Sequence, residues 1–294
     1  MPHFPATMLA ASCVVLATTP SSLVSAFVAP SARTVLSPSG AGPVSDSAAV
    51  ARTTVVGRRP YVLMSTTLDK DKEEVTEYFN NNGFDRWNKI YSESDEVNDV
   101  QRDIRTGHGQ TIEKVLRWIE ADGSANSVFC DAGCGVGSLS IPLARLGAKV
   151  ASSDISAAMT GEAKERAEAE LGRDAKRISF TTSDLENLSG RYDTVLCIDV
   201  MIHYPTEKMS EMVTKLCSMS KNRVILSFAP DTWYYSLLKK IGGLFPGPSK
   251  TTRAYLHTED AVRKALSDQG FAIKRTEMTS TNFYYSRMLE AVRE

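Results

Sequence analysis

The 294-residue sequence has little of several features that mark whole classes of protein. Its formal net charge is −1, so it lacks the basic excess that a nucleic-acid-binding surface requires. Its five cysteines form an odd, unevenly spaced set, which excludes a disulfide framework. No second Cys or His pair accompanies Cys130 and Cys134 at zinc-ligand spacing. We therefore expect reduced cysteines, no nucleic-acid partner and no protein-bound metal.

The sequence also lacks a long apolar run at its N-terminus, where residues 8–19 are too short to span a bilayer. This run ends near a small-residue site at 24–26 of the kind that signal peptidase cuts. Residues 27–64 are rich in Ser, Ala, Thr and Val and carry arginines with almost no acid, which is typical of an organelle transit peptide. The sequence predicts a signal peptide over 1–26 and a transit peptide over 27–64.

The junction between these two segments, SAFVAP around Phe27, resembles the bipartite leader of algae whose plastid lies inside extra membranes. The resemblance implies delivery to a complex plastid, with a mature chain that starts near Ser65. We expect a stromal protein, in contact with thylakoid or envelope membrane at most from the surface. The alternative is a secreted protein with a disordered linker, which the absence of paired cysteines disfavours.

In the remainder of the chain, the spacing of the apolar residues changes at Gly123. Before it, apolar residues recur at three- and four-residue spacing, which predicts a helical arm over 65–122. After it, short β-branched runs alternate with helical segments, which is typical of an α/β fold with a mostly parallel sheet. These runs are SVFCD, AKVASSD, RISFTTSD, YDTVLCID and NRVILSF. One domain is therefore predicted over 123–294. Two further runs, FAIKRTEM and FYYSRMLEAV, are joined by residues 279–282 and predict an antiparallel hairpin.

A glycine-rich turn follows the first predicted strand, as Asp131-Ala-Gly-Cys-Gly-Val-Gly-Ser. Glycines at this turn allow the backbone to approach a ligand closely, and the following helix N-terminus offers free N–H groups. A dinucleotide fingerprint would need glycine where Ser138 stands, so the spacing disfavours NAD.

Three acidic residues end the next three predicted strands: Asp154, Asp184 and Asp199. The carboxyl ends of parallel strands form the crevice in which such sheets bind ligands, and an acid after the second strand can accept hydrogen bonds from a ribose. Asp199 could instead be an ordinary helix cap.

With this glycine loop and these acids the chain resembles the class I S-adenosylmethionine-dependent methyltransferases. The resemblance implies a Rossmann-like fold and S-adenosylmethionine as methyl donor. It places the glycine loop against the methionine part of the cofactor, Asp154 on the ribose, and Asp184 with Leu185 on the adenine. The implied cofactor-binding residues are Asp131, Gly133, Gly135, Gly137, Asp154, Ile155, Asp184, Leu185 and Asp199.

Three longer stretches, 78–111, 131–159 and 192–205, carry a closer resemblance, to the magnesium-protoporphyrin IX O-methyltransferases. It covers about residues 69–292 and implies methylation of a porphyrin propionate in chlorophyll biosynthesis. It also makes a handover of substrate from a magnesium chelatase subunit an expected partnership. Because a propionate has a pKa of about 4.3, it is ionised at neutral pH and needs no strong general base.

The resemblance implies catalytic roles for Tyr91 and His203, although Tyr91 could be a packed aromatic and His203 a surface residue. Arg105 and His108 share a helix face and could reach the cofactor carboxylate or a propionate. Arg86, Lys89, Lys250 and Arg253 are weaker candidates, for which a solvated charged face is the default. An apolar insertion over 231–254 predicts a substrate lid, or else a membrane-contact helix, with Trp233, Tyr234 and Leu238 against the substrate.

Two other functions remain open from the sequence. The first is a methyltransferase of the same fold that acts on a quinone or another small plastid metabolite. The second is a noncatalytic porphyrin-binding protein, which would bind cofactor or porphyrin without turnover.

Overall fold

The computed structural model describes residues 73–91, 96–124, 126–231 and 255–294. The predicted signal and transit peptides and nearly all of the predicted insertion lie outside these residues. So do three residues predicted to bind substrate, Trp233, Tyr234 and Leu238. Within the described ranges, no helix combines the length and the apolar character that crossing a bilayer requires.

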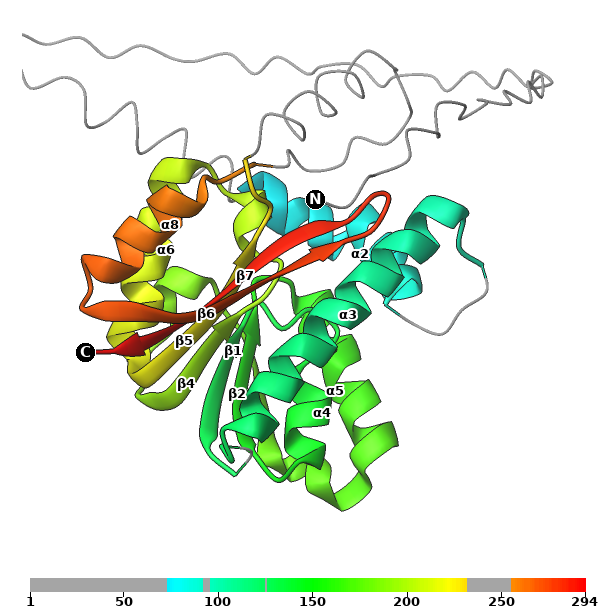
Figure 1. Cartoon of the computed structure of the whole chain (residues 1–294). Coiled ribbons are helices and arrows are strands. Elements are labelled where there is room, and N and C mark those ends of the chain that lie inside the picture. Colours follow the sequence, from blue (N-terminus) through cyan, green and yellow to red (C-terminus); the bar gives the residue numbers. More distant parts are fainter. Residues whose placement is uncertain (1–72, 92–95, 125, 232–254) are drawn as a thin grey trace, which may run out of the picture. The chain divides into compact units, whose positions relative to one another are not determined.

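Seven strands form one sheet in the order β3-β2-β1-β4-β5-β7-β6. The strands are β1 (Val128–Ala132), β2 (Lys149–Asp154), β3 (Ile178–Thr182), β4 (Tyr192–Cys197), β5 (Ser220–Phe228), β6 (Phe271–Ser280) and β7 (Tyr285–Arg293). The first five are parallel to their neighbours, whereas β7 pairs antiparallel with both β5 and β6. The predicted parallel sheet with an antiparallel C-terminal hairpin is confirmed (Figure 1).

Helices connect the strands, and the part of the predicted arm that the structure describes is helical as well. The chain is helical at 73–80. The other α-helices are α2 (Asn82–Ile90), α3 (Asp99–Ala121), α4 (Ser140–Arg145), α5 (Ala157–Leu171), α6 (Thr206–Met219) and α8 (Glu259–Ser267). The 3₁₀ helices are η1 (Gly172–Arg177), η2 (Leu185–Asn187) and η3 (Met201–His203). Ser156 and Thr258 cap α5 and α8 through their hydroxyl oxygens.

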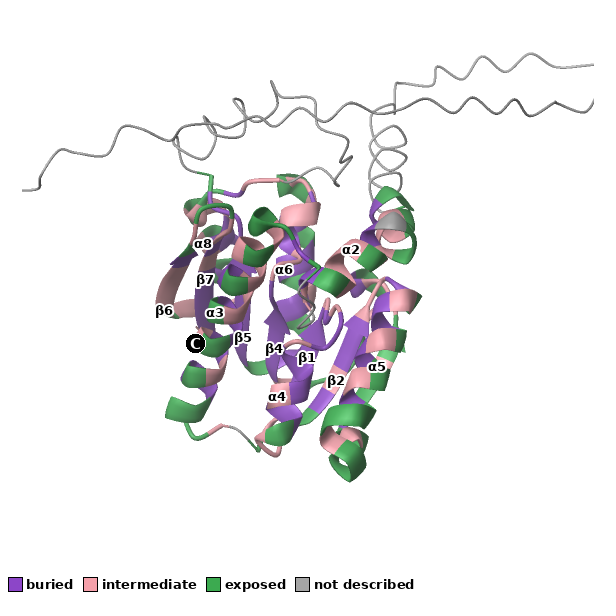
Figure 2. Ribbon diagram, turned by 90° about the vertical axis from the view of Figure 1, so that its right-hand side faces the viewer, coloured by how far each residue is buried: buried purple, intermediate pink, exposed green. Residues whose placement is uncertain are grey.

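The sheet separates two apolar clusters, because successive side chains of a strand point to opposite faces. On β4, Val195 packs with α6 and α8, whereas the next residue, Leu196, packs with the cluster that contains residues of α3 and α4. Figure 2 shows the central strands β1, β4 and β5 largely buried between these helical layers. Continuous apolar runs in the sequence therefore correspond to strands covered on both faces.

The described part of the helical arm is hydrogen-bonded to the β6–β7 hairpin at one place and to α5 and its N-cap at another. At the first place, Asp103 of α3 accepts hydrogen bonds from Thr281 and from the backbone N–H of Phe283, at the tip of the β6–β7 hairpin. At the second, Arg166 of α5 donates to the backbone oxygen of Tyr91, 2.8 Å away, and Ser156 donates to that of Phe79. Through these contacts the arm contributes to the cavity described below.

Candidate functional site

The glycine loop after β1 has the backbone conformation that glycine permits. Gly133, Gly135 and Gly137 have φ angles of +85°, +52° and +87°, in the left-handed region that other residues rarely adopt. At Gly133 an added Cβ would fall 2.1 Å from a methyl of Val200, so glycine is also needed for packing. At Gly135 a Cβ would meet nothing within 4 Å, so this residue borders open space.

Asp154, the last residue of β2, supports this loop. Its carboxylate accepts hydrogen bonds from the backbone N–H groups of Gly135, at 3.0 Å, and of Ser156, at 2.9 Å. Burial raises the pKa of Asp154, although these N–H groups oppose that shift. The residue lies between the loop and the start of α5, where sequence reasoning expected a ribose acceptor.

Asp131, at the end of β1, lies on the wall of the same site. Ser140 donates to its carboxylate at 2.5 Å, and the Ser140 hydroxyl is 2.7 Å from that of Ser152. Burial raises the pKa of Asp131 to about 6, while the hydrogen bond from Ser140 opposes the shift. Asp184, the predicted acid after the third strand, accepts a hydrogen bond from the backbone N–H of Glu186 and so begins η2.

Asp199 follows β4 and is not a helix cap. Its carboxylate accepts hydrogen bonds from His108, Tyr284, Ser227 and Ser286. Burial would raise the pKa of Asp199, but the hydrogen bonds from His108 and Tyr284 among others outweigh it, and the pKa is lowered. Asp199 is therefore ionised, and hydrogen bonds from four protein side chains stabilise its charge.

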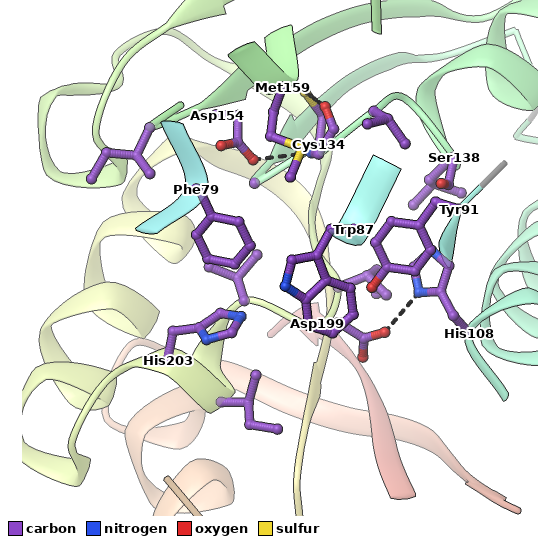
Figure 3. Close-up of a pocket in the computed structure, with 18 of the residues that line it drawn as sticks. Phe79, Trp87, Tyr91, His108, Cys134, Ser138, Asp154, Met159, Asp199 and His203 are labelled. Atoms are coloured by element: carbon purple, nitrogen blue, oxygen red, sulfur yellow. Dashed lines mark hydrogen bonds and ion pairs between the residues drawn. The ribbon is translucent and has the colours of Figure 1, made fainter. Parts of the chain in front are cut away.

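These elements enclose a cavity of about 470 Å³, within the range usual for small-molecule sites. Its polar wall contains the glycine loop and two of the acids, Asp131 and Asp154, together with Asp199. Its other wall comes from the arm and is aromatic, with Phe79, Trp87 and Tyr91 (Figure 3). One cavity thus offers both polar groups that could hold a cofactor and an apolar surface that could receive a second ligand.

Tyr91 and His203, the predicted catalytic residues, both line this cavity. The ring of Tyr91 lies 4.3 Å from that of His108, centroid to centroid, and the ring of His203 lies 5.1 Å from that of Phe79. Burial, assisted by the charge of Asp199, raises the pKa of Tyr91 well above 10. Burial lowers the pKa of His203 to about 4, although Asp199 opposes this. Both side chains are therefore neutral at physiological pH.

The other predicted site residues differ in where they lie. His108, Ile155 and Leu185 line the cavity, but Arg105 is absent from its wall. Arg105 instead donates to the backbone oxygens of Ile90 and Lys89, at 2.7 Å each, and so links α3 to α2. These two hydrogen bonds satisfy carbonyls at the C-terminal end of α2, and the contact of Arg105 with the substrate stays a prediction. Arg86, a weaker candidate, does line the cavity.

Sequence reasoning missed several aromatic residues of the wall: Phe79 and Trp87 in the arm and Phe283, Tyr284 and Tyr285 at the hairpin. The run of three aromatics at the hairpin turn was a usable signal, because a turn rarely needs three large rings. The four described cysteines are buried and free, as predicted. Among the residues that the structure describes, no group of His, Cys, Asp and Glu side chains is arranged to hold a metal ion.

Comparison with known proteins identifies the family to which the chain is similar. Residues 129–223 match a family described as Methyltransferase domain, and residues 197–293 match one described as Magnesium-protoporphyrin IX methyltransferase C-terminus. The chain is 58% identical over 232 residues to the magnesium-protoporphyrin O-methyltransferase of Synechocystis sp., covering 79% of this chain and all of the relative. It is 52% identical over 254 residues to the chloroplastic magnesium protoporphyrin IX methyltransferase of Arabidopsis thaliana, covering 86% of this chain and 81% of the relative.

A solved structure leads to the same family. The crystal structure of the Synechocystis enzyme with bound S-adenosylhomocysteine superposes with a TM-score of 0.71 at 56% identity, covering 76% of this chain and all of that one. A second crystal structure of that enzyme, with S-adenosylmethionine, superposes with a TM-score of 0.68 at 51% identity over 76% of this chain and 97% of that one. Because the chain is 58% and 52% identical to these two relatives and covers 100% and 81% of their lengths, it belongs to the magnesium-protoporphyrin IX O-methyltransferase family.

Proposed function

We propose that this protein transfers a methyl group from S-adenosylmethionine to a propionate carboxylate of magnesium-protoporphyrin IX, which gives the monomethyl ester. The observation that carries the proposal is the two-sided cavity, polar at the glycine loop and aromatic at the arm, in a chain of this family. The cofactor supplies the activated methyl group.

The polar wall fits such a cofactor. The open space at Gly135 leaves room for ligand atoms close to the backbone, and Asp154 beside it offers lone pairs for ribose hydroxyls. We assign Gly133, Gly135 and Gly137 to the methionine part, with Asp131 on the adjoining wall. Ile155, Asp184 and Leu185 are assigned to the adenosine, since Ile155 and Leu185 line the cavity beyond Asp154.

The aromatic wall fits a planar apolar macrocycle. Phe79 and Trp87 offer ring faces, and Arg86 at the same wall offers a cation for a propionate. Since a propionate is already ionised, the protein needs to align and desolvate the reacting carboxylate rather than deprotonate it. We assign that alignment to the neutral phenol of Tyr91, and assign contact with substrate or product to the neutral imidazole of His203.

Product analysis tests this function. The full-length chain is incubated with S-adenosylmethionine and either magnesium-protoporphyrin IX or metal-free protoporphyrin IX, and the products are identified by mass spectrometry. We expect a monomethyl ester from the magnesium form, in excess over the metal-free product. If neither porphyrin is esterified while S-adenosylhomocysteine still binds, the proposed reaction is wrong. A methylated quinone would then support the small-metabolite alternative, and porphyrin binding without turnover the carrier alternative.

The relative named chloroplastic supports a plastid location for this chain as well. We propose that residues 1–26 and 27–64 act in series as signal and transit peptide, and that 65–122 and 231–254 cover the substrate. Fusion of residues 1–64 to a fluorescent protein tests whether this segment directs a protein to the plastid. Loss of this targeting after deletion of residues 1–26 would support a complex plastid. Co-purification with a magnesium chelatase subunit and co-sedimentation with plastid-lipid vesicles test the two proposed contacts.

A further inference from the structure

Asp199 has an unusual conformation and an unusual number of partners. Its φ angle is +60°, and within the described ranges it is the one non-glycine residue with a positive φ. One carboxylate oxygen accepts from His108 Nδ1 at 2.8 Å and from the Tyr284 hydroxyl at 2.7 Å. The other accepts from the hydroxyls of Ser227 at 2.9 Å and Ser286 at 3.1 Å. A backbone held in this region at a site marks a side chain whose direction matters.

The hydrogen bonds of Asp199 leave little of its carboxylate for a ligand. Four donors on two oxygens use the in-plane positions at which a carboxylate accepts. Asp199 is therefore poorly placed to contact a cofactor directly, which was its predicted role. What it does contact is His108, 91 residues earlier in the chain.

The contact with Asp199 fixes how His108 is protonated. Because a carboxylate accepts, Nδ1 of His108 carries a proton, and the ring orientation follows from that bond. The other ring nitrogen, Nε2, is buried and has no hydrogen-bond partner in the part of the chain that the structure describes. A buried polar atom without a partner is uncommon, and at the wall of a ligand cavity it indicates a group that the ligand brings.

The charges around the cavity indicate which group this is. Three carboxylates, Asp131, Asp154 and Asp199, belong to the wall, and none of them can bind an anion. A histidine ring that is protonated on both nitrogens donates from both, and because Asp199 already accepts from Nδ1, Nε2 is the donor left for a ligand. His108 therefore suits an anionic acceptor. S-adenosylmethionine and the porphyrin share one such group, a carboxylate.

We propose that Asp199 is a positioning residue that orients His108, and that Nε2 of His108 donates a hydrogen bond to a ligand carboxylate in the cavity. The carboxylate comes from the methionine part of the cofactor or from a porphyrin propionate. The second source rests on the proposed function, whereas the first does not.

His108→Asn isolates this nitrogen, because the asparagine amide can still donate to Asp199 but has no atom at the place of Nε2. Binding is measured with two matched ligand pairs. By calorimetry, S-adenosylhomocysteine is compared with its decarboxylated analogue, which keeps the amine and lacks only the carboxylate. Magnesium-protoporphyrin IX is compared with its dimethyl ester by porphyrin fluorescence. We expect H108N to weaken the binding of either S-adenosylhomocysteine or free-acid magnesium-protoporphyrin IX at least tenfold. The affinity for the matched ligand without the free carboxylate should change less than twofold.

A double-mutant cycle tests the positioning role. Asp199→Asn should weaken the same carboxylate ligand in the wild-type background but add little in the H108N background, because Asp199 acts through His108. If D199N lowers the affinity for this ligand by the same factor in both backgrounds, Asp199 contacts the ligand itself and the proposal is wrong. If H108N is poorly folded by its melting temperature, His108→Gln, which keeps an amide near Nε2, serves instead and should retain more binding than His108→Phe.

The outcomes separate this proposal from the proposed function. A selective loss of S-adenosylhomocysteine assigns the cofactor carboxylate, even if no porphyrin is esterified. A selective loss of free-acid porphyrin assigns a propionate. Equal losses for both members of each pair, or no loss in either, overturn the proposal, while an esterified product from the wild-type chain would still uphold the reaction.

Discussion

The backbone of Gly107 on α3 lies against the ring of Tyr284 at the β6–β7 hairpin. A methyl group at Gly107 would fall 2.3 Å from Cδ1 of that ring, well inside any real contact. Tyr284 cannot simply move aside, because its hydroxyl is bound by Asp199 and Thr111. The close approach of α3 to the hairpin thus depends on the absence of one side chain.

Gly107→Ala should therefore destabilise the protein by about 1–3 kcal/mol, as overpacking of a close contact does. Gly109→Ala is the matched control on the same helix, since a Cβ there would meet nothing within 4 Å. It should be neutral or stabilise by up to about 1 kcal/mol, because alanine is the better helix former. Urea denaturation gives the free energy of unfolding of both variants. Equal values for G107A and G109A would show that the close contact between Gly107 and the Tyr284 ring is absent.

Asp154→Asn should weaken S-adenosylhomocysteine binding by about tenfold or more, because an ionised hydrogen-bond acceptor is lost from the loop and from the assigned ribose site. Asp193→Asn is its control, because Asp193 also accepts a backbone N–H, from Val128 at 2.9 Å, but does not line the cavity. Calorimetry measures the affinity of D154N and of D193N for S-adenosylhomocysteine. An unchanged affinity in D154N would remove Asp154 from the cofactor site.

Tyr91→Phe should lower kcat on the order of tenfold or more while cofactor affinity stays within twofold, because the phenol is assigned to the reacting carboxylate and not to the cofactor. Tyr192→Phe is the control, since its hydroxyl bonds the backbone of Ser189 outside the cavity. Steady-state kinetics and calorimetry give the two readouts. A Y91F variant that turns over like the wild type would make Tyr91 a packing residue.

The buried Asp131 should contribute a pH dependence of stability. Its folded pKa of about 6 lies above the ordinary value of 3.8, so the folded state holds its proton more tightly. The resulting stabilisation is complete below pH 3.8 and is lost as the pH rises through 6. Between pH 5 and pH 7.5 it amounts to about 1.4 kcal/mol.

Asp131→Asn should remove this dependence. Urea denaturation at the two pH values gives the stability difference between wild type and D131N, and that difference should shift in favour of the wild type at the lower pH. A constant difference would show that the folded and unfolded pKa values of Asp131 are equal.

His203 should remain neutral far below the usual histidine range, because burial lowers its pKa to about 4. In an NMR titration of labelled histidine, the resonance that His203→Gln removes should not shift between pH 8 and pH 5.5. A midpoint near 6.5 would instead mean that the imidazole is solvated and can carry charge during the reaction.

The parts of the fold that depend on local pattern could be predicted from the sequence. The run SVFCD corresponds to β1, and the helix caps Ser156 and Thr258 stand where polar residues precede an apolar stripe. The positive φ angles of the glycine loop and the antiparallel hairpin likewise follow from residue type and spacing. In each case the residues that decide the structure are neighbours in the chain.

The interior of the site could not be predicted, because it depends on contacts between distant segments. His108 meets Asp199 across 91 residues, and Tyr284 meets Asp199 across 85. Arg105 faces the same way on its helix as a ligand residue would, yet it serves the end of α2. The register of α3 over the hairpin decides these pairings, and no periodicity in the sequence encodes that register.

The hairpin that closes the sheet also sets the order in which the site can form during synthesis. Tyr284 and Ser286, which hold Asp199, stand among the last eleven residues of the chain. A growing chain can assemble strands β1 through β5 before these residues leave the ribosome, but Asp199 then lacks the two donors that β7 and its preceding turn supply. Asp199 therefore gains its full set of hydrogen-bond donors only when the last strand has formed.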